Sequence, residues 1–385
     1  MAREFFISSY LFLFNIFFSI FKHLPLKDKT VLVTSFGDNI NHVRKQCLQE
    51  TDHELIILVT GSCRVDFSES VREQVLKFET VNLIQSIKSI YHLATARVIF
   101  VDNYFGFLAV TEFNSDVKVV QLWHAAGAIK RFGLHDPTIQ SRSVRAHKRF
   151  RAVYQRFTDV VIGSDQMGDI FKQAFDLTES QLLKTGIPRT DFFFDQDRVQ
   201  KAVESVTIKH PQIKGKKVIL YAPTFRYSEI GSAGLHLDLK LLYEAFHETH
   251  VILLRLHPVV KRGFSIEKYS NFIIDASSYP NMNELLTVAD YLITDYSSIP
   301  FEFSLLNRPM IFYSYDLGDY VDERGFWTDY EASMPGPVVT STEGIVEHIL
   351  ADDFNLAKVE QFSKLWNTYS TGQSAKSVVN AIYKK

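Results

Sequence analysis

Short apolar runs that alternate with longer amphipathic stretches constrain the fold of this chain more than any other feature of its sequence. The first five runs are Thr30–Ser35, Leu55–Thr60, Val98–Asp102, Val117–Leu122 and Val160–Gly163. The second five are Val218–Ala222, Val251–Leu256, Phe272–Asp275, Tyr291–Thr294 and Met310–Tyr313. Continuous apolar strands separated by helical patterns are typical of parallel sheets covered by helices on both faces. We therefore predict an α/β protein built from two Rossmann-like domains.

The length of the chain agrees with two domains, since it has 385 residues and a domain holds roughly 150. The polar stretch Asp195–Gly215 separates the two sets of runs and has the composition of a linker. We place the boundary there, with an apolar helix over residues 1–26, one domain over 27–195 and another over 196–385. The final residues, 356–385, carry helical patterns and are expected to pack back across the cleft between the domains.

Composition and missing motifs disfavour several function classes. The 42 basic and 44 acidic side chains leave a net charge of −2, so affinity for a polyanion or a membrane must come from a local patch. Two cysteines, Cys47 and Cys63, are too few for a disulfide framework or a zinc site and fit a reducing compartment. Neither GxGxxG nor GxxxxGK[ST] is present, which disfavours ordinary NAD binding and a P-loop NTPase. Asp195 and Asp197 form an Asp-x-Asp string, whose polar surroundings favour a solvated turn or a helix start over a metal–nucleotide site.

The N-terminal segment is strongly apolar. Residues 5–21 carry no charge. This run of 17 residues is just short of the roughly 20 that span a bilayer as a helix. On a helical wheel the polar residues of this segment gather in one narrow stripe, formed by Glu4, Ser8, Asn15, Ser19 and Lys22. This pattern favours a helix that lies along a membrane interface. The alternatives are packing on the protein's own core and a true membrane span. A signal peptide is disfavoured because the segment lacks a basic start and a small-residue cleavage site.

A basic stretch lies in the same predicted domain. Between Lys118 and Arg156 there are nine Lys or Arg residues and one acid, Asp136, a local charge of +8. A charge run is often only a solvated face, but next to an apolar helix it fits anionic lipid headgroups or a lipid-linked diphosphate. Nucleic acid is the competing polyanion, and it is disfavoured because no nucleic-acid-binding motif accompanies the stretch.

Ligands of open α/β sheets bind beyond the carboxyl ends of the strands, and polar residues follow the first set of runs. His124 opens a loop of small residues through which a backbone can approach a phosphate, namely Ala125, Ala126, Gly127 and Ala128. An imidazole with a pKa of about 6.5 can take a proton at neutral pH. Lys130 and Arg131 follow this loop. The turn Gly186–Asp191 presents Arg189, whose guanidinium suits bidentate phosphate contact, although an internal Arg–Asp pair is the alternative.

Three strings in the second set have the same character. The first is Tyr221-Ala222-Pro223-Thr224-Phe225-Arg226, the second Arg255-Leu256-His257-Pro258, and the third Thr294-Asp295-Tyr296-Ser297-Ser298-Ile299-Pro300-Phe301-Glu302-Phe303. In the third string a strand ends and a helix begins, with Ser297 or Ser298 as the N-cap and Pro300 in the first turn. Free amides and hydroxyls at that point predict an anion site, and with Arg189, Arg255 and His257 they predict a diphosphate pocket.

With these strings, the chain resembles the CDP-glycerol glycerophosphotransferase family of teichoic acid synthesis in Gram-positive bacteria. The resemblance runs from about Trp123 to Pro337. It rests on Trp123-His124, Gly186-x-Pro188-Arg189-x-Asp191, Ala222-Pro223-Thr224-x-Arg226, Arg255-x-His257-Pro258, Asp295-Tyr296-Ser297-Ser298-x-x-Phe301-Glu302, Arg324-Gly325-Phe326 and Pro335-Gly336-Pro337. It implies a GT-B fold with the active site in the cleft between two Rossmann-like domains, residues 27–195 serving the acceptor and 196–385 binding CDP-glycerol.

The resemblance also implies roles for single residues. An acceptor hydroxyl would attack the glycerol-bearing β-phosphorus of CDP-glycerol and release CMP, with His124 as the suspected general base and Arg189 and His257 as further catalytic residues. Substrate binding would fall to Ala125, Ala126, Gly127, Ala128, Lys130, Pro223, Thr224, Arg226, Arg255, Leu256, Ser297, Ser298 and Glu302. Clustered cations reduce the need for a metal, so we predict no cofactor and no tightly bound metal ion, with room for assistance by Mg²⁺.

Within the family, the length of the chain and its apolar N-terminal helix resemble the primase branch. Such a primase adds one glycerol phosphate to the N-acetylmannosamine of a disaccharide on undecaprenyl diphosphate, as a peripheral protein at the cytoplasmic face of the membrane and alongside other teichoic acid enzymes. Polymerases of the family have Gly-Thr-Pro where this chain has Ala125-Ala126-Gly127, and Asp where it has Glu302. The alternatives are a glycerol- or ribitol-phosphate polymerase, a GT-B sugar transferase, and a protein that binds lipid or polymer without turnover.

Overall fold

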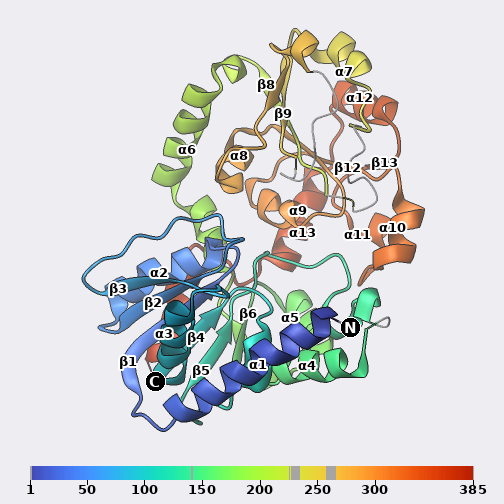
Figure 1. The fold of residues 1–385 in the computed structure, drawn as a ribbon. Coiled ribbons are helices and arrows are strands. Elements are labelled where there is room, and N and C mark those ends of the chain that lie inside the picture. Colours follow the sequence, from blue (N-terminus) through green and yellow to red (C-terminus); the bar gives the residue numbers. More distant parts are fainter. Residues whose placement is uncertain (1, 140–141, 225, 227–234, 257–265, 385) are drawn as a thin grey trace. The chain divides into compact units, whose positions relative to one another are not determined.

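The chain forms two compact α/β units in a computed structural model that describes residues 2–139, 142–224, 226, 235–256 and 266–384 (Figure 1). The first unit comprises Met1–Ala125, Phe132–Asp191 and Thr368–Lys385, and the second comprises Ala126–Arg131 and Phe192–Asn367. The division after Asp191 lies close to the boundary predicted near residue 195. The units are not continuous in sequence as the predicted ranges are, because one short loop belongs to the second unit and the C-terminal segment to the first.

Among the described residues, the first unit holds a parallel sheet of seven strands in the order β3-β2-β1-β4-β5-β6-β7. The strands are β1 (Lys27–Thr34), β2 (Glu54–Val59), β3 (Glu73–Lys77), β4 (Ala96–Val101), β5 (Lys118–Gln121), β6 (Asp159–Ile162) and β7 (Leu182–Lys184). The helices are α1 (Ala2–Phe21), α2 (Asp38–Glu50), α3 (Leu83–Ala94), α4 (Val144–Tyr154), α5 (Asp165–Phe175) and α14 (Ser374–Tyr383), joined by the 3₁₀ turns η1 (Gly106–Val110), η2 (Gly133–His135), η3 (Pro137–Ile139) and η4 (Glu179–Gln181). The central strands are mostly apolar and buried because helices cover both faces of the sheet.

In its described part, the second unit holds a parallel sheet of six strands in the order β10-β9-β8-β11-β12-β13. The strands are β8 (Lys217–Tyr221), β9 (His250–Leu254), β10 (Ile273–Asp275), β11 (Tyr291–Thr294), β12 (Met310–Tyr313) and β13 (Val338–Val339). The helices are α6 (Gln196–Lys209), α7 (Leu239–Phe246), α8 (Met282–Val288), α9 (Ile299–Phe303), α10 (Leu317–Arg324), α11 (Tyr330–Ser333), α12 (Thr342–Ala351) and α13 (Leu356–Trp366). The prediction of two Rossmann-like parallel-sheet domains is confirmed.

The start of the linker-like stretch and the C-terminal helix have a defined local structure. The side chain of Asp195 accepts a hydrogen bond from the backbone N–H of Arg198 at 3.0 Å and is the N-cap of α6. The predicted helix start at this acidic pair is therefore confirmed. At the other end of the chain, α14 returns to the first unit, where the hydroxyl of Tyr383 is hydrogen-bonded to that of Thr30 on β1.

Helix α1 packs one face on the first unit and leaves the other exposed. Its buried residues are Leu11, Phe14 and Phe18, and the rings of Phe14 and Phe107 stack with their centroids 5.3 Å apart. On the opposite face Phe5, Phe6 and Phe12 are about two-thirds exposed. By length and composition, Glu4–Phe21 is also apolar enough to cross a membrane. The alternative of packing on the protein's own core thus describes one face of this helix, and its membrane interaction stays a prediction.

Candidate functional site

Asp102 organises the carboxyl edge of the first sheet. It follows β4, is fully buried, and its carboxylate accepts hydrogen bonds from the backbone N–H groups of Ser35, Phe36 and Gly37 at 2.9 to 3.0 Å. The hydroxyl of Thr34 also donates to this carboxylate. A carboxylate that accepts several backbone N–H bonds holds its loop in one conformation. Asp102 therefore fixes the turn that joins β1 to α2.

His124 follows β5 and lies directly beside this turn. Its Nδ1 is 3.1 Å from the main-chain oxygen of Asp102. Because a carbonyl oxygen only accepts hydrogen bonds, Nδ1 carries the proton and the lone pair of the neutral ring is on Nε2. The imidazole stacks between the rings of Phe36 and Trp123, with centroids 4.1 and 4.2 Å away. The ring is thus held in one orientation and in the tautomer that a general base needs at Nε2.

Trp123 holds a strained backbone next to His124. Its φ of 58° lies in the left-handed region, which costs an L-residue about 1–2 kcal/mol. The N–H of Trp123 donates to the side chain of Gln121 at 2.8 Å, and its carbonyl accepts from Asn39 at 2.9 Å. Strain of this kind persists where the surroundings compensate for it, and it concentrates at functional sites.

Arg189 meets His124 in the same unit. Its Nη1 donates to the main-chain oxygen of His124 at 2.9 Å and lies 3.6 Å from the carboxylate of Asp38. The backbone N–H of Arg189 donates to the side chain of Asn39, which also binds Trp123. The structure therefore brings together His124 and Arg189, two of the predicted catalytic residues. It also places the carboxylate of Asp38 next to the guanidinium of Arg189.

The remainder of the Arg189 motif has a structural explanation. Gly186 has a φ of +80°, and a Cβ there would lie 2.4 Å from the carbonyl oxygen of Tyr369. The carboxylate of Asp191 accepts hydrogen bonds from the backbone N–H groups of Ser374 and Ala375 at 2.8 and 2.9 Å, at the start of α14. The glycine and the acid of this motif thus anchor the C-terminal segment, and Arg189 is the member that faces the site.

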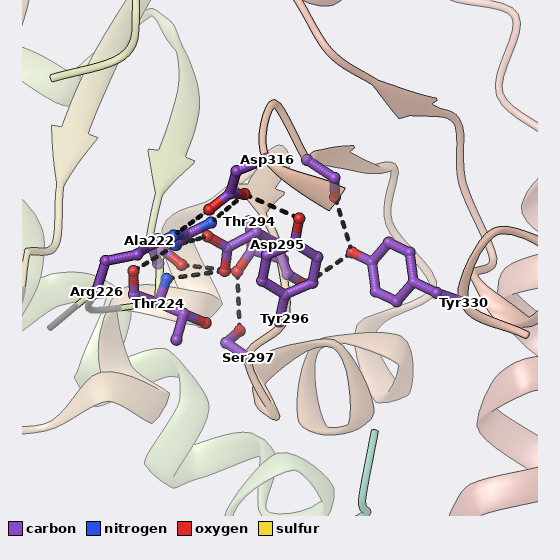
Figure 2. Close-up of polar contacts among 10 residues, drawn as sticks. Ala222, Thr224, Arg226, Thr294, Asp295, Tyr296, Ser297, Asp316 and Tyr330 are labelled. Carbon is purple, nitrogen blue, oxygen red and sulfur yellow. Dashed lines mark hydrogen bonds and ion pairs between the residues drawn. The ribbon is translucent and has the colours of Figure 1, made fainter. Parts of the chain in front are cut away.

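Arg226 is the centre of a buried network at the carboxyl edge of the second sheet (Figure 2). Its guanidinium donates to both carboxylate oxygens of Asp316, each at 2.9 Å, and to Asp295 at 2.5 Å. The hydroxyl of Tyr296 donates to Asp316 at 2.9 Å, and the hydroxyl of Tyr330 donates to the main-chain oxygen of Asp295 at 3.0 Å. Burial favours a lower pKa for Arg226, but the two carboxylates outweigh it and raise the pKa.

This network gives Arg226 a structural role besides the substrate binding that was predicted for it. Its side chain is almost fully buried and lies over the rings of Tyr296, Tyr315 and Tyr320, 5.1 to 5.5 Å from their centroids. The charge of Arg226 is balanced by Asp295 and Asp316. This geometry indicates that Arg226 stabilises the turn after β11. Substrate binding by Arg226 stays a prediction.

Hydroxyls line the turn that the network holds. The hydroxyl of Thr294 donates to the main-chain oxygen of Ala222 at 2.6 Å and is 2.8 Å from that of Ser297. Ser298 is the N-cap of α9, without a side-chain cap hydrogen bond, and α9 is a single short turn of helix followed by the 3₁₀ turn η9 (Ser304–Leu306). Glu302 in α9 is fully buried. The predicted strand end and helix start are present, and anion binding there stays a prediction.

The loop after His124 divides between the units. Ala125 is buried in the first, and Ala126, Gly127, Ala128 and Lys130 belong to the second. The N–H of Arg131 donates to the main-chain oxygen of Gly325, and Lys130 forms a β-bridge with Phe326. Burial lowers the pKa of Lys130 to about 8, against the opposing effect of Asp295. A cation from the loop thus lies in the electrostatic field of the Arg226 network.

The remaining predicted residues lie at the ends of β8 and β9. The N–H of Thr224 donates to Asp295 at 2.8 Å, directly after the half-buried Pro223. Arg255 is half-buried, with Nη1 3.5 Å from the main-chain oxygen of Ala276, and the N–H of Leu256 donates to Ser277. His257 lies outside the described residues.

Several residues that shape these two edges were not predicted from the sequence. Phe36, Asn39 and Asp102 position His124 and Arg189, and Asp316 and Tyr330 complete the Arg226 network. A signal existed for the two acids, because each follows an apolar run at the carboxyl end of its strand. In the part of the chain that the structure describes, no group of three or more His, Cys, Asp or Glu residues is arranged to hold a metal ion.

Comparisons with known proteins agree with this architecture. A sequence model described as CDP-Glycerol:Poly(glycerophosphate) glycerophosphotransferase matches residues 16–384. The chain is 35% identical over 357 residues to a teichoic acid glycerol-phosphate primase of Bacillus subtilis, covering 92% of both chains. It is 31% identical over 381 residues to a teichoic acid poly(ribitol-phosphate) polymerase of Bacillus spizizenii, covering 96% of this chain and 58% of the polymerase. The fold is similar to that of the wall teichoic acid polymerase TagF, with a TM-score of 0.80 and 24% identity over 100% of this chain and 98% of that one.

Proposed function

Because the chain belongs to the CDP-glycerol glycerophosphotransferase family, we propose that it is the primase of a teichoic acid linkage unit. In this proposal the enzyme transfers one glycerol phosphate from CDP-glycerol to the N-acetylmannosamine of a disaccharide carried on undecaprenyl diphosphate. The observation that carries the proposal is the match to a glycerol-phosphate primase along 92% of both chains.

The general base of the proposed reaction is His124. A sugar hydroxyl of the acceptor attacks the β-phosphorus of CDP-glycerol, the bond from that phosphorus to the bridging oxygen breaks, and CMP leaves. Nε2 of His124 takes the hydroxyl proton, and an imidazolium forms. The hydrogen bond from Nδ1 to the carbonyl of Asp102 stabilises this imidazolium and so favours the proton transfer. Phe36 and Trp123 keep the ring oriented during the transfer.

We assign the binding of the donor's negative charge to cations and hydroxyls of the protein. Arg189 and Arg255 are the guanidinium groups for the diphosphate, together with Lys130 and the hydroxyls of Ser297 and Ser298. Phosphoryl transfer depends mainly on positioning and electrostatic stabilisation, so these groups would supply most of the rate. We propose that they do so without a tightly bound metal ion, and that Mg²⁺ at most assists. Removal of divalent cations with EDTA should then leave most of the activity.

A membrane location completes the proposal. The acceptor carries a lipid, and the exposed aromatic face of α1 together with the basic helix α4 would hold the enzyme at the cytoplasmic face of the membrane, near other teichoic acid enzymes.

The test follows CMP release and the mass of the acceptor when the purified enzyme is given CDP-glycerol and a synthetic disaccharide-diphospholipid. A gain of one glycerol phosphate supports the primase, and a ladder of additions would make the enzyme a polymerase. Parallel reactions with CDP-ribitol test whether the enzyme is a ribitol-phosphate primase. The chain is 32% identical to a teichoic acid ribitol-phosphate primase of Bacillus spizizenii and covers 92% of that protein. Reactions with a UDP-sugar or a CMP-sugar test the sugar transferase, and binding of CDP-glycerol without any turnover would indicate a binding protein.

A further inference from the structure

An apolar groove of about 310 Å³ lies between α1 and α3 in the first unit, and neither the family nor the proposed reaction assigns it a role. Its floor is formed by Phe14, Phe78 and Ile90, each no more than 5% exposed. Its rim includes Leu13, Val81 and Ile87, which are exposed. Ligand cavities in proteins begin at about 300 Å³. The groove is therefore large enough for part of a small ligand.

The chemistry of the lining restricts that ligand. Apart from Tyr10, Glu79, Thr80 and Ser86, the side chains that line the groove are hydrocarbon or phenyl groups. One of these hydroxyls is already used, since Ser86 donates to the main-chain oxygen of Thr80 at 3.1 Å. A polar ligand would replace few of its hydrogen bonds to water here, because most of the lining is apolar. The lining fits a hydrocarbon chain.

The surface around the groove indicates where such a chain comes from. The rim continues into the exposed apolar face of α1, with Phe12 and Ile16, and into the start of α3, with Leu83 and Ile84. An apolar surface of this extent on a helix typically contacts a membrane.

The charge beside this face complements an anionic bilayer. Helix α4 carries Arg145, Lys148, Arg149 and Arg151 and no acid. It packs on η1, as α1 does, and Arg149 forms an ion pair with Glu4 of α1 at 3.2 Å. Figure 1 shows α4 beside the N-terminal end of α1. Basic residues near an anionic lipid surface each contribute about 1 kcal/mol to binding.

We propose that the groove between α1 and α3 holds one acyl chain of a phospholipid from an anionic bilayer. A chain that leaves the bilayer and enters the groove covers Phe14, Phe78 and Ile90, while the outer face of α1 rests in the interface. This inference rests on the proposed membrane association but not on the proposed transfer reaction.

The test uses vesicles of phosphatidylglycerol and phosphatidylethanolamine that contain a phosphatidylglycerol with a diazirine on one acyl chain. After irradiation without CDP-glycerol, labelled positions are mapped by mass spectrometry of the full-length protein. We expect labels on the floor, at Phe78 and Ile90, as well as on the outer face at Phe12 and Ile16. Labels confined to the outer face, or no label at all, would overturn the proposal.

A matched pair of variants sharpens this test. Ile87→Trp fills the groove from its rim, and Ile208→Trp makes the same change at an exposed position on α6. If the tryptophan excludes two methylenes from the groove, labelling of Phe78 and Ile90 falls roughly tenfold, with labelling of Phe12 retained. Ile208→Trp should leave the wild-type pattern.

A competition experiment separates the lipid source. Unlabelled undecaprenyl phosphate added to the vesicles should not reduce the floor labels more than the same amount of phosphatidylglycerol does. Selective loss of the floor labels would assign the groove to a polyprenyl chain and contradict the proposal. Because no donor is present, these results do not depend on transferase activity, and the CMP release assay remains a separate test of the reaction.

Discussion

The main-chain oxygen of Asp102 accepts a hydrogen bond from Nδ1 of His124 at 3.1 Å, while the carboxylate of the same residue holds the turn that carries Phe36. One residue therefore sets the tautomer of the imidazole through its backbone and supports the ring that stacks on it through its side chain. The carbonyl of Asp102 and the rings of Phe36 and Trp123 thus orient the imidazole of His124.

Asp102→Asn should lower both stability and turnover. The amide replaces one acceptor oxygen with an N–H₂ group that faces backbone donors, and a buried unsatisfied donor costs about 1–3 kcal/mol. Phe36 loses its fixed position, so kcat should fall more than the affinity for CDP-glycerol. Urea unfolding and CMP release measure the two effects. Asp116→Asn, at an exposed acid in the same unit, is the matched control and should leave both unchanged.

His124→Ala should abolish most turnover and leave CDP-glycerol bound. A general base contributes about 10²–10⁴ to the rate, so kcat should fall by a factor in that range while the dissociation constant from calorimetry stays within a few-fold. Ser297→Ala with Ser298→Ala should show the opposite pattern, with weaker binding. A His124→Ala enzyme that turned over normally, or that lost donor binding alone, would contradict the assigned roles.

Much of the fold was predictable because the buried strands are continuous apolar runs. The strands that the sequence did not reveal are β3, β7 and β13, and each is at an edge of its sheet. Edge strands are flanked by solvent on one side and need less apolar surface; β3, for example, reads Glu-Gln-Val-Leu-Lys. The pattern that identifies a central strand is therefore weak at the edges.

The candidate site was predictable at its strand ends and less so in its supporting contacts. His124 and Arg189 are 65 residues apart in sequence, and the prediction that polar strand ends gather at one sheet edge placed them together correctly. Arg226 shows the limit of that rule. A cation after a strand looks the same in sequence whether it faces a ligand or an acid of the protein. Asp316, one of the two acids that Arg226 contacts, is 90 residues away.

The Arg226 network should dominate the stability of the second unit. Arg226→Leu leaves the buried Asp295 and the partly buried Asp316 without their shared cation, and breaking a buried pair in this way costs about 3–5 kcal/mol. Arg97→Leu removes an exposed ion pair with Asp28, and such pairs contribute only about 0–1 kcal/mol. Urea unfolding of both variants measures the difference. Equal losses would show that the network is not the buried anchor that its geometry indicates.

Lys130 gives the donor affinity a specific pH dependence. Burial lowers its pKa to about 8, so the ammonium is charged below that pH and loses its proton above it. If Lys130 binds the diphosphate, the dissociation constant of CDP-glycerol should rise as the pH increases through 8. Lys130→Arg keeps its charge and should bind with little change up to pH of about 9.5. A wild-type affinity that is flat over this range would remove Lys130 from the donor site.

Gly127→Ala tests whether the loop after His124 must pack closely on α9. A Cβ at residue 127 would lie 2.6 Å from the ring of Phe301, a contact that requires either the loop or the ring to move. Forcing an extra methyl group into a packed core costs about 1–3 kcal/mol.

Gly318→Ala is the matched control on α10, where a Cβ meets nothing within 4 Å. It should be neutral or slightly stabilising, because alanine favours a helix over glycine by about 1 kcal/mol. Since residues 125–129 connect His124 to Lys130, the displaced loop in Gly127→Ala should also reduce kcat. CMP release by both variants, at one temperature below their unfolding transitions, measures that loss. A Gly127→Ala enzyme with wild-type stability and turnover would show that this loop tolerates movement and that the close packing on Phe301 has no part in catalysis.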